Sequence, residues 1–371
     1  MFREENFYQF SWRQLLGKNN HPAENTYNNA NIIEEYHHIL CPIEDYPQFL
    51  KKYLELPMLQ RLKGIGLLCG SDWTKLFNNR FFYSRYDHSV GVALIIWHFT
   101  HSKEQTVAGL LHDVSTPVFS HVSDFRKGDA LTQTSTEEEN EGLIRGNKEL
   151  AKLLTEDGLC VEAVEDYHKY PVADNEIPQL SSDRLEYMFP SGMVLEGSWS
   201  LEEISSVYND LCVLKNEQNL DELGFNTLEM AELYCYRFCK TGHILQRNED
   251  KLTLHMLGQI MNKAVEEKLL EEQDFMTKNE TQIFEKITGK GSDEFQQLLK
   301  TFINMEEIKH TEEALEKHFC VNLRVKQRYI NPLVKTANGN KRLFDISEKS
   351  KQIISTFLSF EDTAFGCVKL Q

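Results

Sequence analysis

The chain has 371 residues, of which 40 are Lys or Arg and 57 are Asp or Glu, so its formal net charge at pH 7 is −17. Its 41% hydrophobic and 26% charged residues are typical of globular proteins and exclude a fully disordered or fibrous chain. A surface this negative repels phosphate backbones, which argues against duplex DNA or RNA as a partner. A small anionic substrate would therefore need a local positive centre, either a metal ion or a few placed Lys and Arg side chains.

The first part of the chain is predicted to be an irregular arm followed by helices. Residues 1–44 are polar and rich in Asn, and they predict the arm. Apolar side chains at three- and four-residue spacings predict helices over 47–66, 87–100 and 105–113. The third helix is expected to end before Pro117, because a proline disfavours helical geometry at the residue that precedes it.

The rest of the chain is predicted to be mostly helical, with strands near the C-terminus. Residues 127–141 are polar and acidic and predict a loop, and α-type periodicity then dominates from 142 to 318. Alternating apolar and polar residues predict short strands at 321–330 and 341–347, and 364–370 is a candidate for a third. The expected fold is therefore mainly α, with a small C-terminal β element.

The cysteines and the apolar runs indicate a compartment. The eight cysteines are irregularly spaced and contain no C-x-x-C pair, which disfavours a cysteine zinc site. The N-terminal residues MFREENFYQFSWRQLL carry charges where a signal peptide needs an apolar run. No stretch approaches the roughly 20 apolar residues of a membrane span. We therefore expect a cytoplasmic protein with reduced cysteines and no membrane association.

Histidine and aspartate residues in three apolar helical segments suggest a metal site. Side chains at adjacent positions of a continuous helix point about 100° apart, so His112 and Asp113 can converge only where the backbone leaves the helix. Their place just before Pro117 meets that condition, and His88 and Asp183 would complete a set of two imidazoles and two carboxylates. Such a set suits a divalent ion such as Mn, Fe, Ni, Co, Zn or Mg. Taken singly, each of these residues is more ordinary, because a lone His on an amphipathic helix is usually a core or surface residue.

The order of these motifs resembles that of a known family. The matching segments are LQRLKGIGLL (59–68), SRYDHSVGV (84–92), LLHDVSTPVFSHVSDF (110–125), DRLEY (183–187), KQRYINPLV (326–334) and KRLF (341–344). Together they resemble the HD-domain phosphohydrolases, and among these the deoxynucleoside triphosphate triphosphohydrolase branch. The resemblance implies a helical-bundle HD core over 45–195, a helical extension over 196–318 that packs on it, and a small β/α element over 319–371.

The resemblance also implies roles for individual residues. The implied ligands of one divalent metal ion are His88, His112, Asp113 and Asp183. The implied phosphate-binding residues are Arg85, Arg184, Tyr187 and, by a looser match, Lys240. The implied catalytic residues beside the metal are His121, Asp124 and Asp113, with His121 as the acid or base in proton transfer.

The sequence departs from this branch at several positions. Thr116 stands where the triphosphohydrolases carry a second histidine near the reacting phosphorus, and Thr cannot act as an acid or base near neutral pH. No histidine between His121 and His168 supplies their later His-Glu pair, and the glutamates at 137–139 read as a solvated run. Leu67 replaces a glutamine that helps to recognise deoxyribose. Triphosphate cleavage and deoxynucleotide preference are therefore weaker expectations than the metal site.

The expected function is a metal-dependent phosphohydrolase that cleaves a phosphate ester of a nucleotide or related small molecule, with dNTP triphosphohydrolysis as one option. The alternative is a regulatory nucleotide-binding HD protein with weak or no turnover. A homo-oligomer is expected from the resemblance alone. The basic stretch 324–342 is either a phosphate-binding, regulatory or subunit-contact surface, or a hairpin with outward Lys and Arg. Aromatic residues at 234, 236 and 238 are either base-stacking or core residues.

Overall fold

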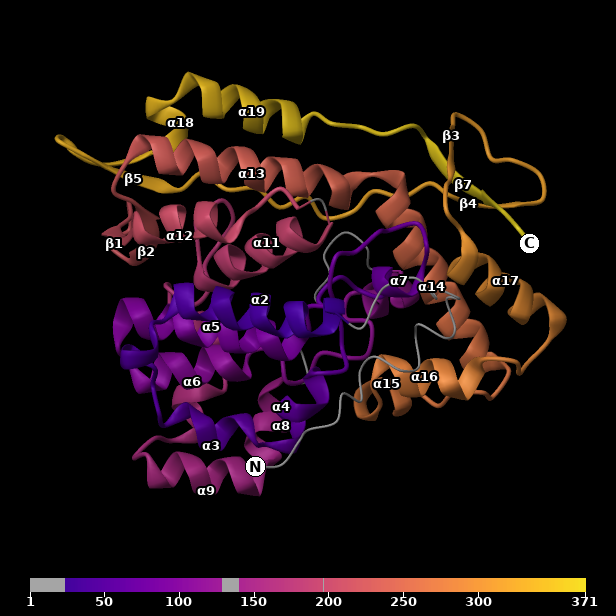
Figure 1. Cartoon of the computed structure of the whole chain (residues 1–371), viewed down its shortest axis with the longest axis horizontal. Helices are drawn as coiled ribbons and strands as arrows, with labels where there is room; N and C mark the ends of the chain where they lie inside the picture. Colours follow the sequence, from indigo (N-terminus) through magenta and orange to yellow (C-terminus); the bar gives the residue numbers. More distant parts are fainter. Residues whose placement is uncertain (1–23, 129–139, 196) are drawn as a thin grey trace.

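The structure is a computed structural model that describes residues 24–128, 140–195 and 197–371 (Figure 1). Helices make up most of it, as expected. In the N-terminal part they are α2 (Glu24–Leu40), α3 (Leu50–Leu54), α4 (Pro57–Leu62), α5 (Arg85–Thr100), α6 (Lys103–Leu111), α7 (Val122–Lys127), α8 (Asn140–Gly146), α9 (Lys148–Glu156), α10 (Val161–Val164), α11 (Ser182–Leu195) and α12 (Leu201–Asn209). The remaining helices are α13 (Leu228–Gln246), α14 (Asn248–Glu266), α15 (Asp274–Thr277), α16 (Glu280–Ile287), α17 (Asp293–Asn304), α18 (Leu343–Ile346) and α19 (Glu348–Leu358), with 3-10 turns at Ile43–Asp45, Ser71–Trp73 and Tyr167–Lys169.

Seven strands form two small sheets. The strands are β1 (Leu211–Lys215), β2 (Asp221–Phe225), β3 (Lys309–Thr311), β4 (His318–Val321), β5 (Leu333–Thr336), β6 (Gly339–Arg342) and β7 (Phe365–Lys369). The first sheet has the order β1-β2-β5-β6, and its β2–β5 pair is parallel. The second is the antiparallel sheet β3-β7-β4. The C-terminal segment therefore pairs with a hairpin that lies about a hundred residues earlier in the sequence.

Two hydrophobic cores hold the helices together. Helix α5 lies inside the larger core because its residues 88–96 are all buried, and it packs between α6, α11 and α2. Helix α13 runs along this half with α19 on its outer side, and α14 then descends into the other half of the molecule (Figure 1). The smaller core there is built from α7, α14, α16 and α17 around Trp73, whose ring stacks on Phe284 at 4.0 Å.

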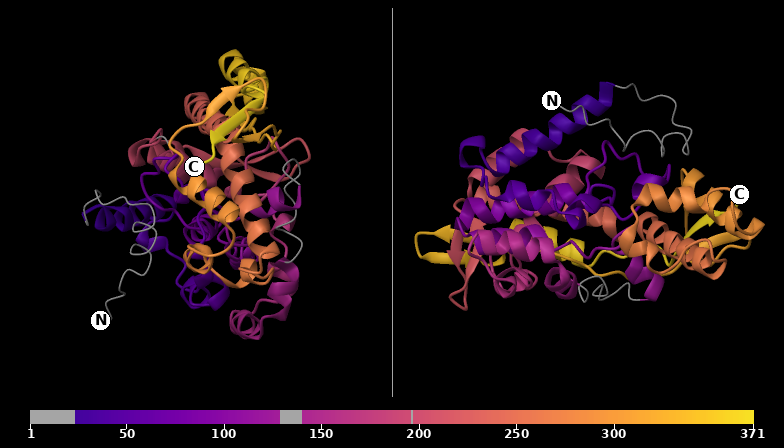
Figure 2. Two further views of the ribbon diagram at one scale, coloured as in Figure 1. Left: turned by 90° about the vertical axis from the view of Figure 1, so that its right-hand side faces the viewer. Right: turned by 90° about the horizontal axis from the view of Figure 1, so that it is seen from below.

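The expectation of an irregular N-terminal arm is wrong from Glu24 onward, because α2 extends to Leu40. Tyr36 and Leu40 are fully buried in the larger core, and His37 Nε2 lies 3.1 Å from the carbonyl oxygen of Asp87 at the start of α5. Figure 2 shows α2, in indigo, on the outer face of this half. Tertiary packing on α5 thus supports a helix that its polar, Asn-rich sequence did not indicate. The part of the predicted arm before Glu24 lies outside the described residues.

Two strand predictions near the C-terminus are also corrected. Strand β4 ends at Val321, and residues 322–332 have no regular structure. Among the described residues, the segment pairs with no strand, and a side chain satisfies part of its backbone, since Gln246 Nε2 donates to the carbonyl oxygen of Lys326 at 3.1 Å. The strand predicted over 341–347 ends at Arg342, where α18 begins. The third candidate strand is confirmed as β7, and the β1–β2 hairpin was not predicted.

The expectation of uniformly reduced cysteines is wrong for one pair. Cys320 of β4 and Cys367 of β7 face each other in the antiparallel ladder and form a disulfide. Sequence spacing could not show this pairing, because the two residues meet only once the sheet has formed. Among the residues described, no helix is long and apolar enough to cross a membrane.

Candidate metal centre

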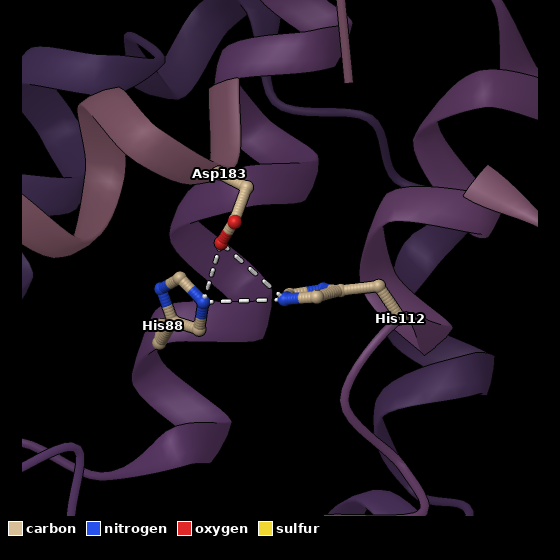
Figure 3. A group of neighbouring side chains, drawn as sticks. All are labelled: His88, His112 and Asp183. Atoms are coloured by element: carbon tan, nitrogen blue, oxygen red, sulfur yellow. Dashed lines mark hydrogen bonds and ion pairs between the residues drawn. The ribbon is translucent and has the colours of Figure 1, made fainter. Parts of the chain in front are cut away.

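Three helices bring the predicted ligands to one point. Helix α5 begins with a capping box, in which Ser84 and Asp87 exchange side-chain to backbone hydrogen bonds, so His88 lies in its first turn. His112 is the residue at which α6 ends, and Asp183 lies in the first turn of α11. His112 therefore lies at a helix end, as the sequence predicted. Figure 3 shows the side chains of His88, His112 and Asp183 pointing toward one another.

The three side chains form a compact cluster of ligand atoms. His88 Nε2 lies 3.2 Å from His112 Nε2 and 3.1 Å from Asp183 Oδ1, and His112 Nε2 lies 3.6 Å from the same oxygen. The other ring nitrogens are engaged elsewhere: His88 Nδ1 lies 2.5 Å from Glu186 Oε2, and His112 Nδ1 lies 2.7 Å from the carbonyl oxygen of Gly109. Both Nδ1 atoms therefore act as donors, so when both rings are neutral, two Nε2 lone pairs and a carboxylate oxygen face each other. Three electron-rich atoms at this separation fit a cation, and the donor set suits a divalent metal.

Asp113, the fourth predicted ligand, lies beside this cluster. Its Oδ2 is 3.6 Å from His112 Nε2 and 3.8 Å from His88 Nε2, but the same oxygen accepts a hydrogen bond from Arg85 Nη1 at 2.8 Å. Burial would raise the pKa of this carboxyl group, but Arg85 and the two imidazoles outweigh burial and hold the pKa well below its usual range. Asp113 is thus an ionised carboxylate near the cluster, and its role as a ligand stays a prediction.

Thr116 has a structural role that the sequence analysis did not predict. Its hydroxyl donates to Asp113 Oδ1 at 2.9 Å, so both oxygens of that carboxylate are held. The guanidinium of Arg61 in turn donates to the carbonyl oxygens of Thr116 and Val114, at 2.5 and 3.3 Å. Thr116, which stands where the triphosphohydrolases carry a histidine, therefore fixes the orientation of Asp113.

Glu186 is a further residue of the site that sequence reasoning missed. It is fully buried, and its Oε1 accepts a hydrogen bond from the Tyr83 hydroxyl at 2.5 Å while its Oε2 accepts from His88. A Cβ atom at Gly91 would collide with this carboxylate, so the glycine makes room for it. Burial opposes a charged imidazole, but Glu186 and Asp183 outweigh burial and raise the pKa of His88 to about 10. The sequence carried one signal for Glu186, namely its spacing: it lies three positions after Asp183, and residues three apart lie on the same face of a helix.

The cluster opens on a cavity of about 360 Å³. This volume is in the range of small-molecule sites. Apolar side chains of Leu67, Phe125, Phe238 and Leu254 line part of it, so residues of both hydrophobic cores contribute to the wall. The cavity can therefore hold a molecule with an apolar body and a polar group directed at His88, His112 and Asp183.

The predicted phosphate-binding cations are largely engaged with protein groups. Arg85 lines the cavity, but it is held by Asp113 and by the Ser120 hydroxyl, which accepts from its Nε at 3.0 Å. The guanidinium of Arg184 donates to Asn175 Oδ1 at 2.8 Å, to the carbonyl oxygen of Asn175 at 2.7 Å and to that of Gln179. Its side chain therefore stabilises the loop before α11.

Tyr187 and Lys240 differ in their positions. Tyr187 lines the cavity, and its buried hydroxyl has no hydrogen-bond partner among the described residues. Lys240 is exposed on α13, and the cavity wall does not include it. The structure thus places Tyr187 at the cavity with a buried hydroxyl that has no partner among the described residues, and it gives no positional support to the role predicted for Lys240.

His121 and Asp124 form the predicted pair. His121 lines the cavity, and its Nδ1 lies 2.9 Å from Oδ2 of the fully buried Asp124. Burial lowers the pKa of His121, and this effect outweighs the opposing effect of Asp124, so the ring is neutral near pH 7. A neutral imidazole that donates through Nδ1 keeps its Nε2 lone pair and can accept a proton. The glutamates at 137–139 lie outside the described residues.

The sequence left two interpretations open for the aromatic residues at 234, 236 and 238 and two for the basic stretch 324–342, and the positions of these residues bear on both. Tyr234 and Phe238 are buried core residues, whereas Tyr236 is exposed. In the basic stretch, Arg342 is paired with Glu222 and Glu217. The other charged residues of the β5–β6 hairpin, Lys335 and Lys341, are exposed, as the outward-facing interpretation predicts.

Comparisons with known proteins give a consistent outline. No protein-family model matches the chain. It is 29% identical over 188 residues to the uncharacterised protein YdhJ of Bacillus subtilis, covering 50% of this chain and 53% of that protein. It is also 27% identical over 165 residues to the metal-dependent phosphohydrolase cns2 of Cordyceps militaris, covering 44% of this chain and 45% of that protein. The chain thus spans about half the length of the curated relatives that it matches.

Solved structures share its fold over most of its length. A hypothetical protein from Aquifex aeolicus matches with a TM-score of 0.58 at 15% identity, over 86% of this chain and 91% of that one. A phosphohydrolase from Bacteroides thetaiotaomicron matches with a TM-score of 0.58 at 13% identity, over 86% and 94%. The chain therefore has the fold of a known phosphohydrolase, and part of its sequence is similar to a metal-dependent one.

Proposed function

We propose that this chain is a metal-dependent phosphohydrolase that cleaves a phosphate ester of a nucleotide or related small molecule. The observation that carries the proposal is the convergence of two imidazole Nε2 atoms and the Asp183 carboxylate at the wall of a cavity. Both Nδ1 atoms are tied to acceptors, so the lone pairs of His88 and His112 are directed at a common point. The partial similarity to a metal-dependent phosphohydrolase supports the same conclusion.

In this proposal, different residues hold the metal ion, accept a proton and contact the substrate. His88, His112 and Asp183 would hold the ion, with Asp113 beside them, and an ion in such a site polarises a phosphoryl oxygen and makes a water molecule more acidic. His121, neutral and oriented by Asp124, would accept a proton from the attacking water. The apolar wall around Leu67, Phe125 and Leu254 would contact the organic part of the substrate. Cleavage of a dNTP is the narrower form of the proposal, and the similarity to the triphosphohydrolase branch supports it only as a resemblance.

The test is a metal analysis combined with a phosphate-release screen. The purified protein is analysed for bound metals by inductively coupled plasma mass spectrometry, supplied with Mn²⁺, and screened against nucleoside mono-, di- and triphosphates. We expect release by the wild type and loss of both metal and activity in Asp183→Asn and His112→Ala. His98→Ala is the matched control, because His98 is an exposed residue on the same helix as His88. Equal phosphate release by wild type and Asp183→Asn on every substrate would overturn the proposal.

A second function is favoured by one observation. Thr116 holds Asp113 in the place where the triphosphohydrolases carry a histidine, so one of their catalytic groups is missing. We propose as the alternative a regulatory nucleotide-binding protein with weak or no turnover. Calorimetric binding of a nucleotide with metal, but without phosphate release, would favour it over the enzyme. The expected homo-oligomer stays a prediction, which the mass measured by light scattering will test.

A further inference from the structure

Arg328 is a cation at the wall of the cavity whose charge no protein group neutralises directly. It belongs to the irregular segment 322–332 and is half-buried where it lines the cavity. Its guanidinium makes neither a hydrogen bond nor an ion pair with any residue that the structure describes. An arginine that is partly withdrawn from water is usually paired, because its five donors need acceptors. In a chain with a net charge of −17, an unpaired arginine inside a cavity calls for a ligand.

The other candidate cations of the cavity are already engaged. Arg85 is bound to Asp113 and Ser120, and the fork of Arg184 is bound to the loop before α11. The charge of Arg85 already lies against the ionised Asp113, and the guanidinium of Arg184 is held by oxygens of the loop before α11, so several of their donors are used. Arg328 has no such partner among the described residues, so all five of its donors stay available to an anion.

The segment that carries Arg328 is anchored on both sides of it. Lys326 accepts a hydrogen bond from Gln246 of α13 through its carbonyl oxygen, and Gln327 Nε2 donates to the carbonyl oxygen of Phe357 at 2.8 Å. On the other side, the backbone N–H of Asn331 donates to the carbonyl oxygen of Pro178 at 2.7 Å, and Ile330 is fully buried. The backbone at Arg328 is therefore fixed before a ligand arrives, which lowers the entropic cost of binding.

His121 and Tyr187, which line the same cavity, lie within electrostatic range of this guanidinium. Burial lowers the pKa of His121 and raises the pKa of Tyr187, and the positive charge of Arg328 acts on both toward a lower pKa. Tyr187 also has a buried hydroxyl without a partner. Arg328 and Tyr187 line one cavity, and a guanidinium is well suited to bind phosphoryl oxygens.

We propose that Arg328, together with the Tyr187 hydroxyl, forms the anion subsite that binds phosphate oxygens of the ligand. This inference rests on the proposed function for the identity of the ligand, and it assigns the phosphate-binding cation to the C-terminal segment. Because the contact is made to the bound phosphate before reaction, its loss raises KM or Kd more than it lowers kcat. Arg328 is a substrate-binding residue, and His121 keeps the proton transfer.

The experiment is a calorimetric titration of the full chain with inorganic phosphate, in the presence of Mg²⁺, and it does not depend on turnover. A charge-assisted, bidentate contact predicts that Arg328→Gln weakens phosphate binding by at least about tenfold. Arg328→Lys keeps the positive charge but loses the planar pair of guanidinium donors, so its phosphate affinity should lie between those of wild type and Arg328→Gln. Arg324→Gln is the matched control, because Arg324 lies in the same segment, is exposed, and forms an ion pair with the exposed Glu361 at 3.6 Å.

The outcomes are separable from those of the proposed function. If Arg328→Gln binds phosphate as wild type does, or if Arg324→Gln loses as much affinity, the subsite is overturned even when hydrolysis is observed. If no phosphate ester is cleaved but Arg328→Gln alone loses phosphate binding, the hydrolase fails and the subsite stands. If Arg328→Gln does not fold, Tyr187→Phe tests the same subsite, because it removes a donor without a protein partner, and unchanged phosphate affinity in it contradicts the proposal.

Discussion

Replacing Glu186 by Gln changes one buried atom and tests how the metal centre is held. In the wild type, both oxygens of this fully buried carboxylate accept hydrogen bonds, one from the Tyr83 hydroxyl and one from His88 Nδ1. A glutamine has one oxygen and one NH₂ group, so it can accept from only one of these two donors. Its NH₂ group would then face the other donor, and His88 would lose the contact that directs its Nε2 at the cluster.

The expected loss of metal affinity follows from two opposed effects. Removing an outer carboxylate that orients a metal-binding histidine costs roughly 10- to 100-fold in affinity, or about 1.4–2.8 kcal/mol. Loss of the negative charge also lowers the pKa of His88 from its raised value of about 10, so its proton becomes easier for a metal to displace. The second effect offsets part of the first at neutral pH. We therefore expect Glu186→Gln to bind Mn²⁺ about tenfold more weakly than wild type.

The assay is a calorimetric titration of metal-free protein with Mn²⁺ at pH 7.5. Tyr83→Phe should give a smaller loss, because it removes one hydrogen bond to Glu186 and leaves the carboxylate in place. Asp157→Asn is the control: this carboxylate also accepts a tyrosine hydroxyl, from Tyr53 at 2.7 Å, but its other partner is Lys52 and it lines no part of the cavity. Equal Mn²⁺ affinity in wild type and Glu186→Gln, with both folded by circular dichroism, would refute the reasoning.

Three further predictions concern other buried contacts. Thr116→Val removes the hydroxyl that holds Asp113 Oδ1, and we expect it to lower phosphate release while leaving the bound metal unchanged. Loss of metal, measured by mass spectrometry, would argue against the idea that Thr116 acts only by orienting Asp113. Arg342→Ala leaves the fully buried Glu222 without its partner at 2.6 Å and should cost about 3–5 kcal/mol in urea unfolding, whereas the Arg342→Met, Glu222→Leu double variant should recover most of it. Burial raises the pKa of Glu280 to about 8, against opposing hydrogen bonds from Trp73 Nε1 and the Gly66 N–H, so its stabilising contribution is present below its unfolded pKa near 4.5 and is lost as pH rises through 8. The stability of wild type relative to Glu280→Gln should therefore fall between pH 5 and pH 9, by at most about 5 kcal/mol, and a pH-independent difference would contradict this.

The sequence predicted the parts of the site that depend on local pattern. His112 lies at a helix end because Pro117 follows it closely, and that signal is readable from a few residues. The meeting of His88, His112 and Asp183 was predicted from the order of motifs and agrees with the structure. The main α character followed from periodicity that extends over long segments, as in α13.

What could not be predicted depends on contacts between distant segments. Arg184 was predicted to bind phosphate. The sequence did not show that oxygens of Asn175 and Gln179, in the loop before α11, accept hydrogen bonds from its guanidinium. Helix α2 forms on α5 rather than from its own propensity. Residues 322–332 pair with no strand in the described part of the chain and are irregular, although their alternating pattern is typical of a strand.

The parallel pairing of β2 with β5 limits how far this chain can be shortened. Gly224 and Phe225 pair with Leu333 and Val334, so the part of the cavity wall that carries Arg328 is attached to the sheet just beyond it. A protein truncated before residue 322 would keep every residue of the metal cluster but would expose the apolar edge of β2 and open one side of the cavity to water. Minimal versions designed around the histidines alone should therefore bind metal yet aggregate and bind phosphate poorly.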